Sequence, residues 1–236
     1  MKVVVAKDYR EICKLVSRIF AAQVTLKPDS VLGLATGSTP VGMYQELVQM
    51  YQEGRIDFSH VRTVNLDEYA GLSGDNDQSY RYFMNHNLFD HININKENTN
   101  VPNGTAADLQ AECERYEQVV ADMGGVDIQL LGIGNNGHIA FNEPCGEFPE
   151  KTHVVDLTQN TIEANARFFE SMDDVPKKAL TMGIGTIMKA KKILLIAGPD
   201  KAEIVEKACF GKVTPEVPAS VLQLHPDVTV ILSAEK

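Results

Sequence analysis

Apolar and polar residues follow two alternating patterns along the chain. Apolar runs such as Val31 to Ala35 and Val126 to Ile133 have almost no polar positions, which is typical of parallel strands that are covered on both faces. Between such runs, apolar residues recur at helical spacing, as in the segment that follows Asp8, a residue suited to cap a helix. The alternation predicts βαβ units and a mainly parallel sheet.

The same alternation continues to the end of the chain. Further strands are expected at Val3 to Ala6, Val61 to Leu66, near Val154, and at Ala179 to Met182, Lys192 to Ala197 and Val228 to Leu232. Helices are expected after Asp8, from Pro40 to about Gln52, and at Ser79 to Phe89, Ala106 to Met123, Thr158 to about Phe169, Thr186 to Lys189 and Asp200 to Ala208. No repeat or linker divides the chain, so residues 1–236 are expected to form a single domain. The predicted fold is α/β and Rossmann-like: a single open, mainly parallel twisted sheet with helices on both faces.

Composition and charge indicate the kind of ligand and the compartment. With 44% hydrophobic residues, the 236-residue chain can bury a large core, and a net charge of −10 argues against nucleic-acid and membrane-surface partners, which need a basic face. A small molecule is the expected partner. The N-terminus is too short and too soon charged for a secretory signal, and no apolar run approaches membrane-spanning length. Four cysteines without CxxC spacing are expected to be reduced thiols in a cytoplasmic protein.

The first candidate site is Ala-Thr-Gly-Ser-Thr-Pro, residues 35–40. It turns from a predicted strand through glycine into a helix N-terminus, where hydroxyl groups and free backbone amides suit a phosphate group. It lacks the lysine of a P-loop and the glycine spacing of a dinucleotide turn, so a nucleotide is not implied. The alternative interpretation is an ordinary capped turn.

The second candidate site is Asn-Leu-Asp-Glu-Tyr, residues 65–69, in which two adjacent acids directly follow a predicted strand. Neighbouring residues on a strand point to opposite sides, so at most one of Asp67 and Glu68 is expected to face a given pocket. Such an acid could be a general base whose pKa is tuned by its surroundings. A solvated acidic turn is the alternative interpretation.

The segment from Leu131 to Pro144 is the most informative, because an apolar run leads through glycines to one histidine and one glutamate. Ligands of open α/β sheets bind outside the carboxyl ends of the strands, so His138 and Glu143 are expected at the rim of the sheet. A lone histidine is more often structural than catalytic. The preceding glycines and the nearby carboxylate favour catalysis here.

Two cofactor hypotheses arise from the same segment. Its glycines match the GxGxxG spacing of a dinucleotide turn, but the segment reaches a proline without helical periodicity, so this hypothesis is rejected. His138 and Glu143 could bind a metal, with Asp67 as the only other obvious ligand. A metal-free pair of acid and base, with no cofactor, is the preferred hypothesis.

Taken together and in this order, the three segments resemble the glucosamine-6-phosphate deaminase family, isomerases that convert glucosamine 6-phosphate to fructose 6-phosphate and ammonia. The resemblance covers nearly the whole chain. It also includes Ala-Asn-Ala-Arg-Phe-Phe at 164–169, Leu-Thr-Met-Gly-Ile-Gly-Thr at 180–186 and Leu-Gln-Leu-His-Pro at 222–226. The resemblance implies the fold that these deaminases share with 6-phosphogluconolactonases, and a role in amino sugar catabolism.

The resemblance implies roles for four residues in the reaction. Asp67 matches the base that moves a proton between C1 and C2 of the opened sugar. His138 matches the residue that opens the ring by moving a proton between the anomeric hydroxyl and the ring oxygen, and Glu143 matches the partner that orients its imidazole. Asn136 stands where many relatives carry an aspartate. It removes one negative charge, and its amide is expected to position the ring in a weaker role.

The resemblance also implies a phosphate clamp, with a small amino sugar phosphate as the partner. Arg167 and Lys201 match the cationic phosphate ligands of the family. The clamp would further include Thr36, Gly37, Ser38 and Thr39. Without the resemblance, both cations would be interpreted as solvated residues on helices. In relatives, the region around Arg167 belongs to a mobile lid.

The chain departs from the allosteric members of the family. Those members carry additional basic residues after the Asn-Glu-Pro motif, where this chain has His153 and Val155, and they have a longer C-terminal tail. The departure predicts hyperbolic kinetics that do not depend on N-acetylglucosamine 6-phosphate. It also predicts a monomer or small homo-oligomer in place of the hexamers of the family.

Two alternatives come from other reactions or functional classes. 6-Phosphogluconolactonases have a similar fold and glycine-histidine segment, but lactone hydrolysis requires no base at C2, so Asp67 favours the isomerase. A non-catalytic sugar-phosphate sensor related to transcriptional regulators would use the same phosphate pocket. No DNA-binding helix pair or basic stripe is visible in this sequence, which argues against the sensor.

Overall fold

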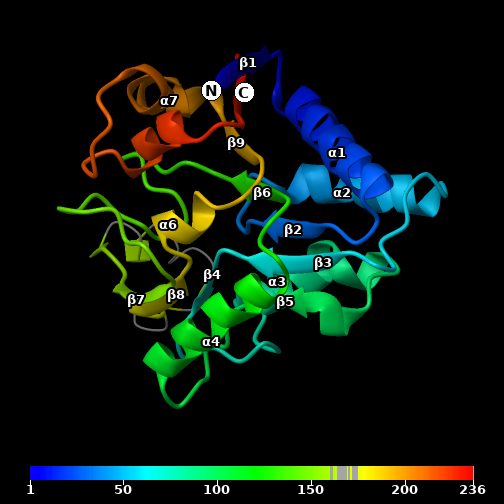
Figure 1. Ribbon diagram of the computed structural model, residues 1–236, viewed down its shortest axis with the longest axis horizontal. Coiled ribbons are helices and arrows are strands. Elements are labelled where there is room, and N and C mark those ends of the chain that lie inside the picture. The colour runs from blue at the N-terminus through cyan, green and yellow to red at the C-terminus, as the bar shows by residue number, and fades with distance from the viewer. Residues whose placement is uncertain (160–161, 164–168, 170, 172–174, 236) are drawn as a thin grey trace.

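A seven-stranded parallel sheet forms the centre of the molecule (Figure 1). The computed structural model describes residues 1–159, 162–163, 169, 171 and 175–235. In spatial order the strands are β1 (Lys2–Ala6), β10 (Val228–Ser233), β9 (Ile193–Ala197), β6 (Ile128–Leu131), β2 (Val31–Leu34), β3 (Arg62–Asn65) and β5 (Thr99–Asn100). Strands β2, β6 and β9 are buried along their whole length, which explains their nearly continuous apolar sequences.

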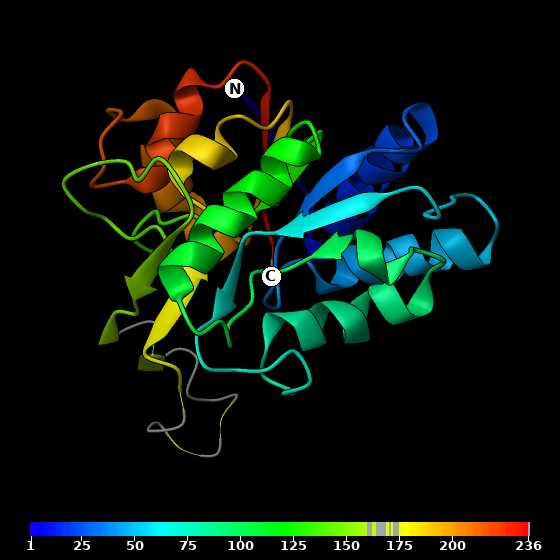
Figure 2. The same cartoon turned by 60° about the horizontal axis from the view of Figure 1, so that its bottom comes forward.

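Helices cover both faces of this sheet. They are α1 (Tyr9–Leu26), α2 (Val41–Gln52), α3 (Tyr80–Asn87), α4 (Leu109–Asp122), α6 (Ile184–Ile187) and α7 (Ala202–Phe210), together with the 3₁₀ helices η1 (Phe89–His91), η2 (Lys96–Asn98), η5 (Pro199–Lys201) and η6 (Pro218–Leu224). Figure 1 shows α1 and α2 on one side of the sheet and α6 and α7 on the other, and Figure 2 shows α4 on the side of α6. This architecture confirms the predicted fold class. Across the described residues, no helix combines the length and the apolarity that crossing a membrane requires.

The direction in which strands are added to the sheet reverses between β2 and β6, which are neighbours. From β2 the chain passes through α2 to β3 and later to β5, toward one edge. From β6 it continues to β9 and β10, toward the other edge. Connections that leave on opposite faces open a crevice outside the carboxyl ends of the two strands, and ligands of open α/β sheets bind there. The segments that follow β2 and β6 are the predicted phosphate turn and the glycine-histidine segment.

A small antiparallel sheet, which the sequence pattern did not predict, lies beside the parallel one. It consists of β4 (Asp67–Tyr69), β8 (Lys178–Thr181) and β7 (His153–Asp156), with β8 in the centre. Two of the predicted strands are therefore confirmed but pair in this second sheet. Three residues of β4 are too few for a periodic signal, so the sequence showed only an acidic turn. The predicted helix from Thr158 to about Phe169 lies largely outside the described residues.

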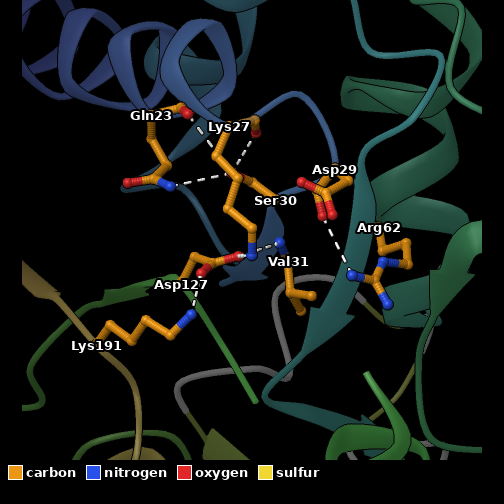
Figure 3. A network of polar contacts seen from close by, with 8 residues as sticks. All are labelled: Gln23, Lys27, Asp29, Ser30, Val31, Arg62, Asp127 and Lys191. Carbon is orange, nitrogen blue, oxygen red and sulfur yellow. Dashed lines mark hydrogen bonds and ion pairs between the residues drawn. The ribbon is translucent and has the colours of Figure 1, made fainter. Parts of the chain in front are cut away.

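A buried carboxylate joins the amino ends of the central strands (Figure 3). Asp127 precedes β6 and is 4% exposed. Its Oδ2 accepts hydrogen bonds from the Lys27 ammonium group at 2.6 Å and from the Val31 amide at 2.8 Å. Its Oδ1 accepts one from the Lys191 ammonium group at 2.7 Å. Burial alone would raise the pKa of this carboxyl group, but the three hydrogen bonds outweigh burial and hold the pKa below its usual value.

Replacing Asp127 with asparagine is expected to lower the free energy of unfolding by about 2 kcal/mol at pH 7, because two ammonium groups lose the charge that they bind. A lowered pKa in the folded state means that the stabilisation is complete above the ordinary pKa of aspartate and is lost as the pH falls below it. Urea unfolding of both proteins at pH 7 and pH 3 measures this. The difference between them should shrink at pH 3, and an equal difference would contradict a role of the charge.

Candidate active site

Three loops at the carboxyl ends of neighbouring strands enclose a cavity of about 200 Å³. Thr36 and Thr39 come from the turn after β2, and Gly134 and His138 come from the segment after β6. Asp67 begins β4, two residues beyond the end of β3. The rest of the wall is formed by Ala35, Leu66, Tyr80, Gly132, Ile133, Ala140 and Phe141. The cavity thus lies in the crevice that the strand order creates, and it brings together the predicted base and the predicted ring-opening residue.

Asp67 lies in this cavity with only 7% of its surface exposed. Within the part of the chain that the structure describes, no group donates a hydrogen bond to its carboxylate. Burial and then the negative charge of Glu68 raise the pKa of Asp67 to about 8. A carboxyl group with this pKa exchanges protons near neutral pH, which suits a general base that acts on a C–H group.

Glu68, the neighbouring acid, faces away from the cavity and binds backbone amides. Its carboxylate accepts hydrogen bonds from the amides of Tyr69 at 2.8 Å, Tyr80 at 2.9 Å and Arg81 at 2.9 Å. The last two belong to the first turn of α3, where amide groups lack partners within the helix. As strand alternation predicts, the two acids point to opposite sides: Asp67 lies in the cavity, and Glu68 binds the backbone amides of β4 and α3.

The imidazole of His138 is held through its Nδ1 atom. Nδ1 lies 2.8 Å from Oδ1 of Asn136 and 3.4 Å from Oε1 of Glu143. The amide nitrogen of Asn136 donates to Oε2 of Glu143 at 2.5 Å, and a carboxylate can only accept, so the amide oxygen must face the imidazole. Nδ1 therefore carries the hydrogen, which leaves Nε2 as the proton acceptor of the neutral ring. Asn136 is thus the closer partner of His138, and Glu143 acts mainly by orienting that amide.

Backbone geometry around His138 is also specialised. A Cβ atom at Gly134 would lie only 2.1 Å from Cε1 of the imidazole, so the ring can occupy its place only over a glycine. Ala140, which lines the same cavity, has a φ of 53°, in the left-handed region that non-glycine residues seldom adopt. Such strain persists where the surrounding structure imposes it, and it concentrates at functional sites.

The predicted phosphate residues surround a connected cleft. Ser38, Thr39 and Lys201 line a second cavity of about 730 Å³, which shares Thr39 and Ile133 with the cavity of Asp67. Gly37, with a φ of 90°, lines a third cavity of about 290 Å³ that shares Ser38 with the second. The N-cap residue of α2, Pro40, makes no side-chain cap, and in the described part of the chain the Tyr9 hydroxyl accepts from one first-turn amide, that of Gly42. The turn and the first amides of this 12-residue helix are therefore suited to bind an anion.

Of the two predicted phosphate-binding cations, the structure describes only Lys201. Lys201 lies at the edge of the second cavity, where its ammonium group contacts Oδ1 of Asn135 and lies 3.2 Å from the Asp200 carboxylate. Its side chain is 21% exposed, which is low for a lysine that sequence alone would place in solvent. Arg167 lies outside the described residues.

Sequence reasoning missed three residues of the cleft. Tyr80 lines the cavity of Asp67, and Asn135 binds the ammonium group of Lys201. The hydroxyl of Tyr9 donates to the carbonyl of Thr39 and accepts from the amide of Gly42, both at 2.9 Å, and burial raises the pKa of Tyr9 to about 12. Tyr9 and Tyr80 each open a helix, and helix periodicity gives such a position no special weight. Among the residues with described positions, no three His, Cys, Asp or Glu side chains form a metal-binding group.

A doubly wound parallel sheet, with a buried carboxylate and an imidazole at its switch point, defines an α/β enzyme of the open-sheet type. Comparison with known proteins gives the family. The chain belongs to the family of glucosamine-6-phosphate isomerases and 6-phosphogluconolactonases, whose family model matches residues 7–231. The resemblance inferred from the sequence is thereby confirmed.

Close relatives span the whole chain. A protein of Lachnoclostridium phytofermentans named glucosamine-6-phosphate deaminase is 60% identical over 236 residues, which are 100% of both chains. A protein of the same name from Clostridium perfringens strain 13 is 58% identical and covers 100% of this chain and 98% of its own. The shared length means that these relatives align with every segment of the site.

Solved structures separate the close relatives from the distant ones. A monomeric glucosamine-6-phosphate deaminase superposes with a TM-score of 0.96 at 52% identity, with coverage of 100% of this chain and 98% of the other. A 6-phosphogluconolactonase from Thermotoga maritima reaches a TM-score of 0.76 at 18% identity, with 98% of both chains covered. The second likeness shows a shared fold alone.

Proposed function

We propose that this protein converts glucosamine 6-phosphate to fructose 6-phosphate and ammonia. The observation that carries the proposal is the buried carboxylate of Asp67, which has no hydrogen-bond donor among the described residues and shares a cavity with His138. A buried acid with a pKa raised to about 8 fits a substrate that brings its own positive charge, because the ammonium group of an amino sugar favours the carboxylate form. The names of the close relatives agree with this substrate.

Binding begins at the phosphate end of the sugar. Ser38, Thr39 and Lys201 line the second cavity, and Val41 at the N-terminus of α2 lines the third cavity, which shares Ser38 with the second. Together these groups would hold a dianion. Arg167 would add a second cation. The second cavity adjoins that of Asp67, so a phosphate bound there leaves the other end of a six-carbon sugar near the acid and base.

Ring opening is the first chemical step. Because Nδ1 of His138 is held by Asn136, Nε2 is the atom that can take the proton of the anomeric hydroxyl and return it to the ring oxygen. Glu143 fixes the amide of Asn136 and places a negative charge near the imidazolium ion that forms in between. The step moves one proton between two oxygens and breaks the bond between C1 and the ring oxygen.

Proton transfer between carbons follows. The Asp67 carboxylate removes the hydrogen of C2, which the neighbouring carbonyl at C1 acidifies, and the electron pair forms an enol bearing the amino group. Asp67 then returns the proton to C1, which leaves an iminium group at C2. Water adds to C2, and ammonia leaves as the ketone forms.

The proposal is tested by incubating the protein with glucosamine 6-phosphate and measuring fructose 6-phosphate and ammonia together. Equal amounts of the two products are expected. A parallel assay with 6-phosphogluconolactone measures the alternative reaction, and a binding assay covers a sensor without turnover. Loss of lactone without ammonia release, or tight binding without any turnover, would refute the deaminase function.

Gly134→Ala is expected to lower kcat/KM about a hundredfold with little loss of stability, because the new methyl group occupies the place of the imidazole ring and forces it out of position. The matched control is Gly146→Ala, outside the residues that line the cavity, since a Cβ atom at that position has no neighbour within 4 Å. Steady-state assays and thermal unfolding of both variants test the prediction. Normal activity in Gly134→Ala would show that the observed ring position is not needed.

The protein is further proposed to be a cytoplasmic monomer without an allosteric effector. The 52%-identical structure is of a monomeric enzyme, and the four cysteines are free thiols. Saturation curves for glucosamine 6-phosphate are expected to be hyperbolic and to stay unchanged when N-acetylglucosamine 6-phosphate is added. Light scattering during sizing chromatography measures the mass. Sigmoidal curves that the effector makes hyperbolic would contradict this prediction.

A further inference from the structure

Glu68 links the strand that begins with Asp67 to the helix that begins with Tyr80. The side chain of Glu68 is buried, with 2% of the residue exposed, and three backbone amides donate to it at 2.8 to 2.9 Å. Two of these amides belong to the first turn of α3, which prefers a negative charge. Burial raises the pKa of Glu68 above its usual value, and the three amide bonds and the charge of Arg81 oppose that rise. The first turn of α3 is therefore fastened to β4 by one side chain.

Tyr80, whose amide binds Glu68, also lines the cavity of Asp67. Its ring stacks on that of Phe141, with centroids 6.2 Å apart and planes 14° apart, and its centroid lies 4.7 Å from that of Tyr69. Burial first, and then the neighbouring Tyr69 and Asp67, raise the pKa of the phenol well above its usual value. The hydroxyl therefore keeps its proton, which it shares in a hydrogen bond with the Tyr69 side chain and which a substrate oxygen would have to accept in place of Tyr69. A neutral donor in the same cavity as the base suits the sugar oxygen that gains negative charge when C2 loses its hydrogen.

The charges around Asp67 come from several elements. In the described part of the chain, its ionisable neighbours are Glu68 and Tyr69 on β4, Tyr80 on α3, Tyr116 on α4 and His138 after β6, while Arg81 on α3 interacts with Glu68. Burial raises the pKa of each of the three tyrosines, so they are neutral. The guanidinium group of Arg81 is turned to Thr99, whose hydroxyl and carbonyl oxygens accept from it at 2.7 and 3.0 Å. Glu68 is thus the group whose charge bears on the carboxylate of Asp67.

We propose that Glu68 is a positioning residue for the reaction: it holds Tyr80 in the cavity wall, where the phenol contacts the substrate as a hydrogen-bond donor, and it keeps a negative charge beside Asp67. The proposal rests on the deaminase function proposed above and deepens it. One buried carboxylate thereby sets both the place of the donor and the proton affinity of the base.

The role of the charge is tested by pH profiles of kcat/KM for glucosamine 6-phosphate. Glu68→Gln is expected to move the acidic limb to lower pH by about one unit, because Asp67 loses a neighbouring negative charge and ionises more readily. Glu68→Asp retains the charge and should keep the limb in place, although its shorter side chain lowers kcat. Asp127→Asn is the control, because it also changes a buried acid to an amide but lies far from the cavity. The acidic limb of its kcat/KM profile should not move. An unmoved limb in Glu68→Gln overturns this half of the proposal.

The role of Tyr80 is tested by removing its hydroxyl. Tyr80→Phe is expected to lower kcat about tenfold or more with little change in KM, because the contact forms mainly in the transition state. Tyr82→Phe, an exposed position on the same helix, should retain wild-type kinetics. In the double variant Glu68→Gln/Tyr80→Phe, the loss should be smaller than the product of the single losses, because Glu68 acts through Tyr80. Wild-type kcat in Tyr80→Phe, or a fully multiplicative loss, overturns this half.

These outcomes remain distinct from failure of the proposed function. If the wild type releases no ammonia, the deaminase function fails before any variant is compared. If the wild type is active and the Glu68 and Tyr80 variants behave like Asp127→Asn and Tyr82→Phe, only the inference fails. If Glu68→Gln does not fold, Glu68→Asp is tested in its place. The acidic limb of Tyr80→Phe, which keeps Glu68, is then the reference. A limb that moves in Glu68→Asp overturns the role of the charge.

Discussion

Asp67→Asn is expected to lower kcat about a thousandfold, the largest effect of any single substitution in this chain. Asparagine has nearly the same shape as aspartate, but its amide cannot accept a proton from C2 at any working pH. The substitution also removes a buried carboxylate that has no hydrogen-bond donor in the described structure, so the fold should not lose stability. A large loss of rate without a loss of stability is the signature of a group that is retained for chemistry.

Binding and catalysis are expected to separate in this variant. The groups proposed to hold the phosphate, the turn of Ser38 and Thr39 and the ammonium group of Lys201, lie in the adjoining cavity and are unchanged. Calorimetric titration with the reduced open-chain analogue, glucosaminitol 6-phosphate, should show that Asp67→Asn still binds, although less tightly than the wild type, because the ammonium group loses the neighbouring carboxylate. Asp127→Asn serves as the control for an acid replaced elsewhere. Turnover by Asp67→Asn within tenfold of the wild type would falsify the assignment of Asp67 as the base.

The parallel sheet was predictable because its strands are buried on both faces. Burial makes apolar runs such as Ile193–Ala197 stand out from the helical periodicity on either side. Parallel pairing then places all the carboxyl ends at one edge, so three segments far apart in sequence were expected to meet there. Asp67 and His138 do line one cavity, and this needed no signal beyond the order of strands and helices.

The small antiparallel sheet and the contacts it creates were not predictable in the same way. β4 has three residues and makes its antiparallel pairing with a strand more than a hundred residues later, and neither fact leaves a local pattern. The pairing is what buries Asp67 and turns Glu68 toward α3. Sequence alternation predicted that the two acids would differ, but only the tertiary structure shows which amides Glu68 binds.

The role of Asn136 shows a second limit of reasoning from sequence. Comparison with an aspartate suggested a weaker role, because one negative charge is missing. In the structure the amide is the nearest partner of the imidazole, and its two ends face groups of opposite hydrogen-bonding character, Nδ1–H of His138 and the carboxylate of Glu143. An amide can relay orientation between a donor and an acceptor in this way, and the sequence alone does not reveal how its ends are turned.

His138→Gln is expected to lower kcat/KM about a hundredfold, because ring opening loses the group that moves its proton. The glutamine amide can still donate a hydrogen bond toward Asn136, but it cannot carry a proton from the anomeric hydroxyl to the ring oxygen. The base at position 67 remains in place, so the step at C2 should be as fast as before once an open-chain molecule has formed. Slow opening then limits the overall rate.

A substrate that carries deuterium at C2 distinguishes this role from a role at carbon. In the wild type, breaking the C2–D bond should slow turnover to the extent that this step limits the rate. In His138→Gln the isotope effect should disappear, because ring opening precedes that bond cleavage and has become limiting. In Asp67→Asn any residual turnover should keep a full isotope effect. An isotope effect that grows in His138→Gln would instead place the imidazole at the C2 proton, and the division of labour between the two side chains would have to be reversed.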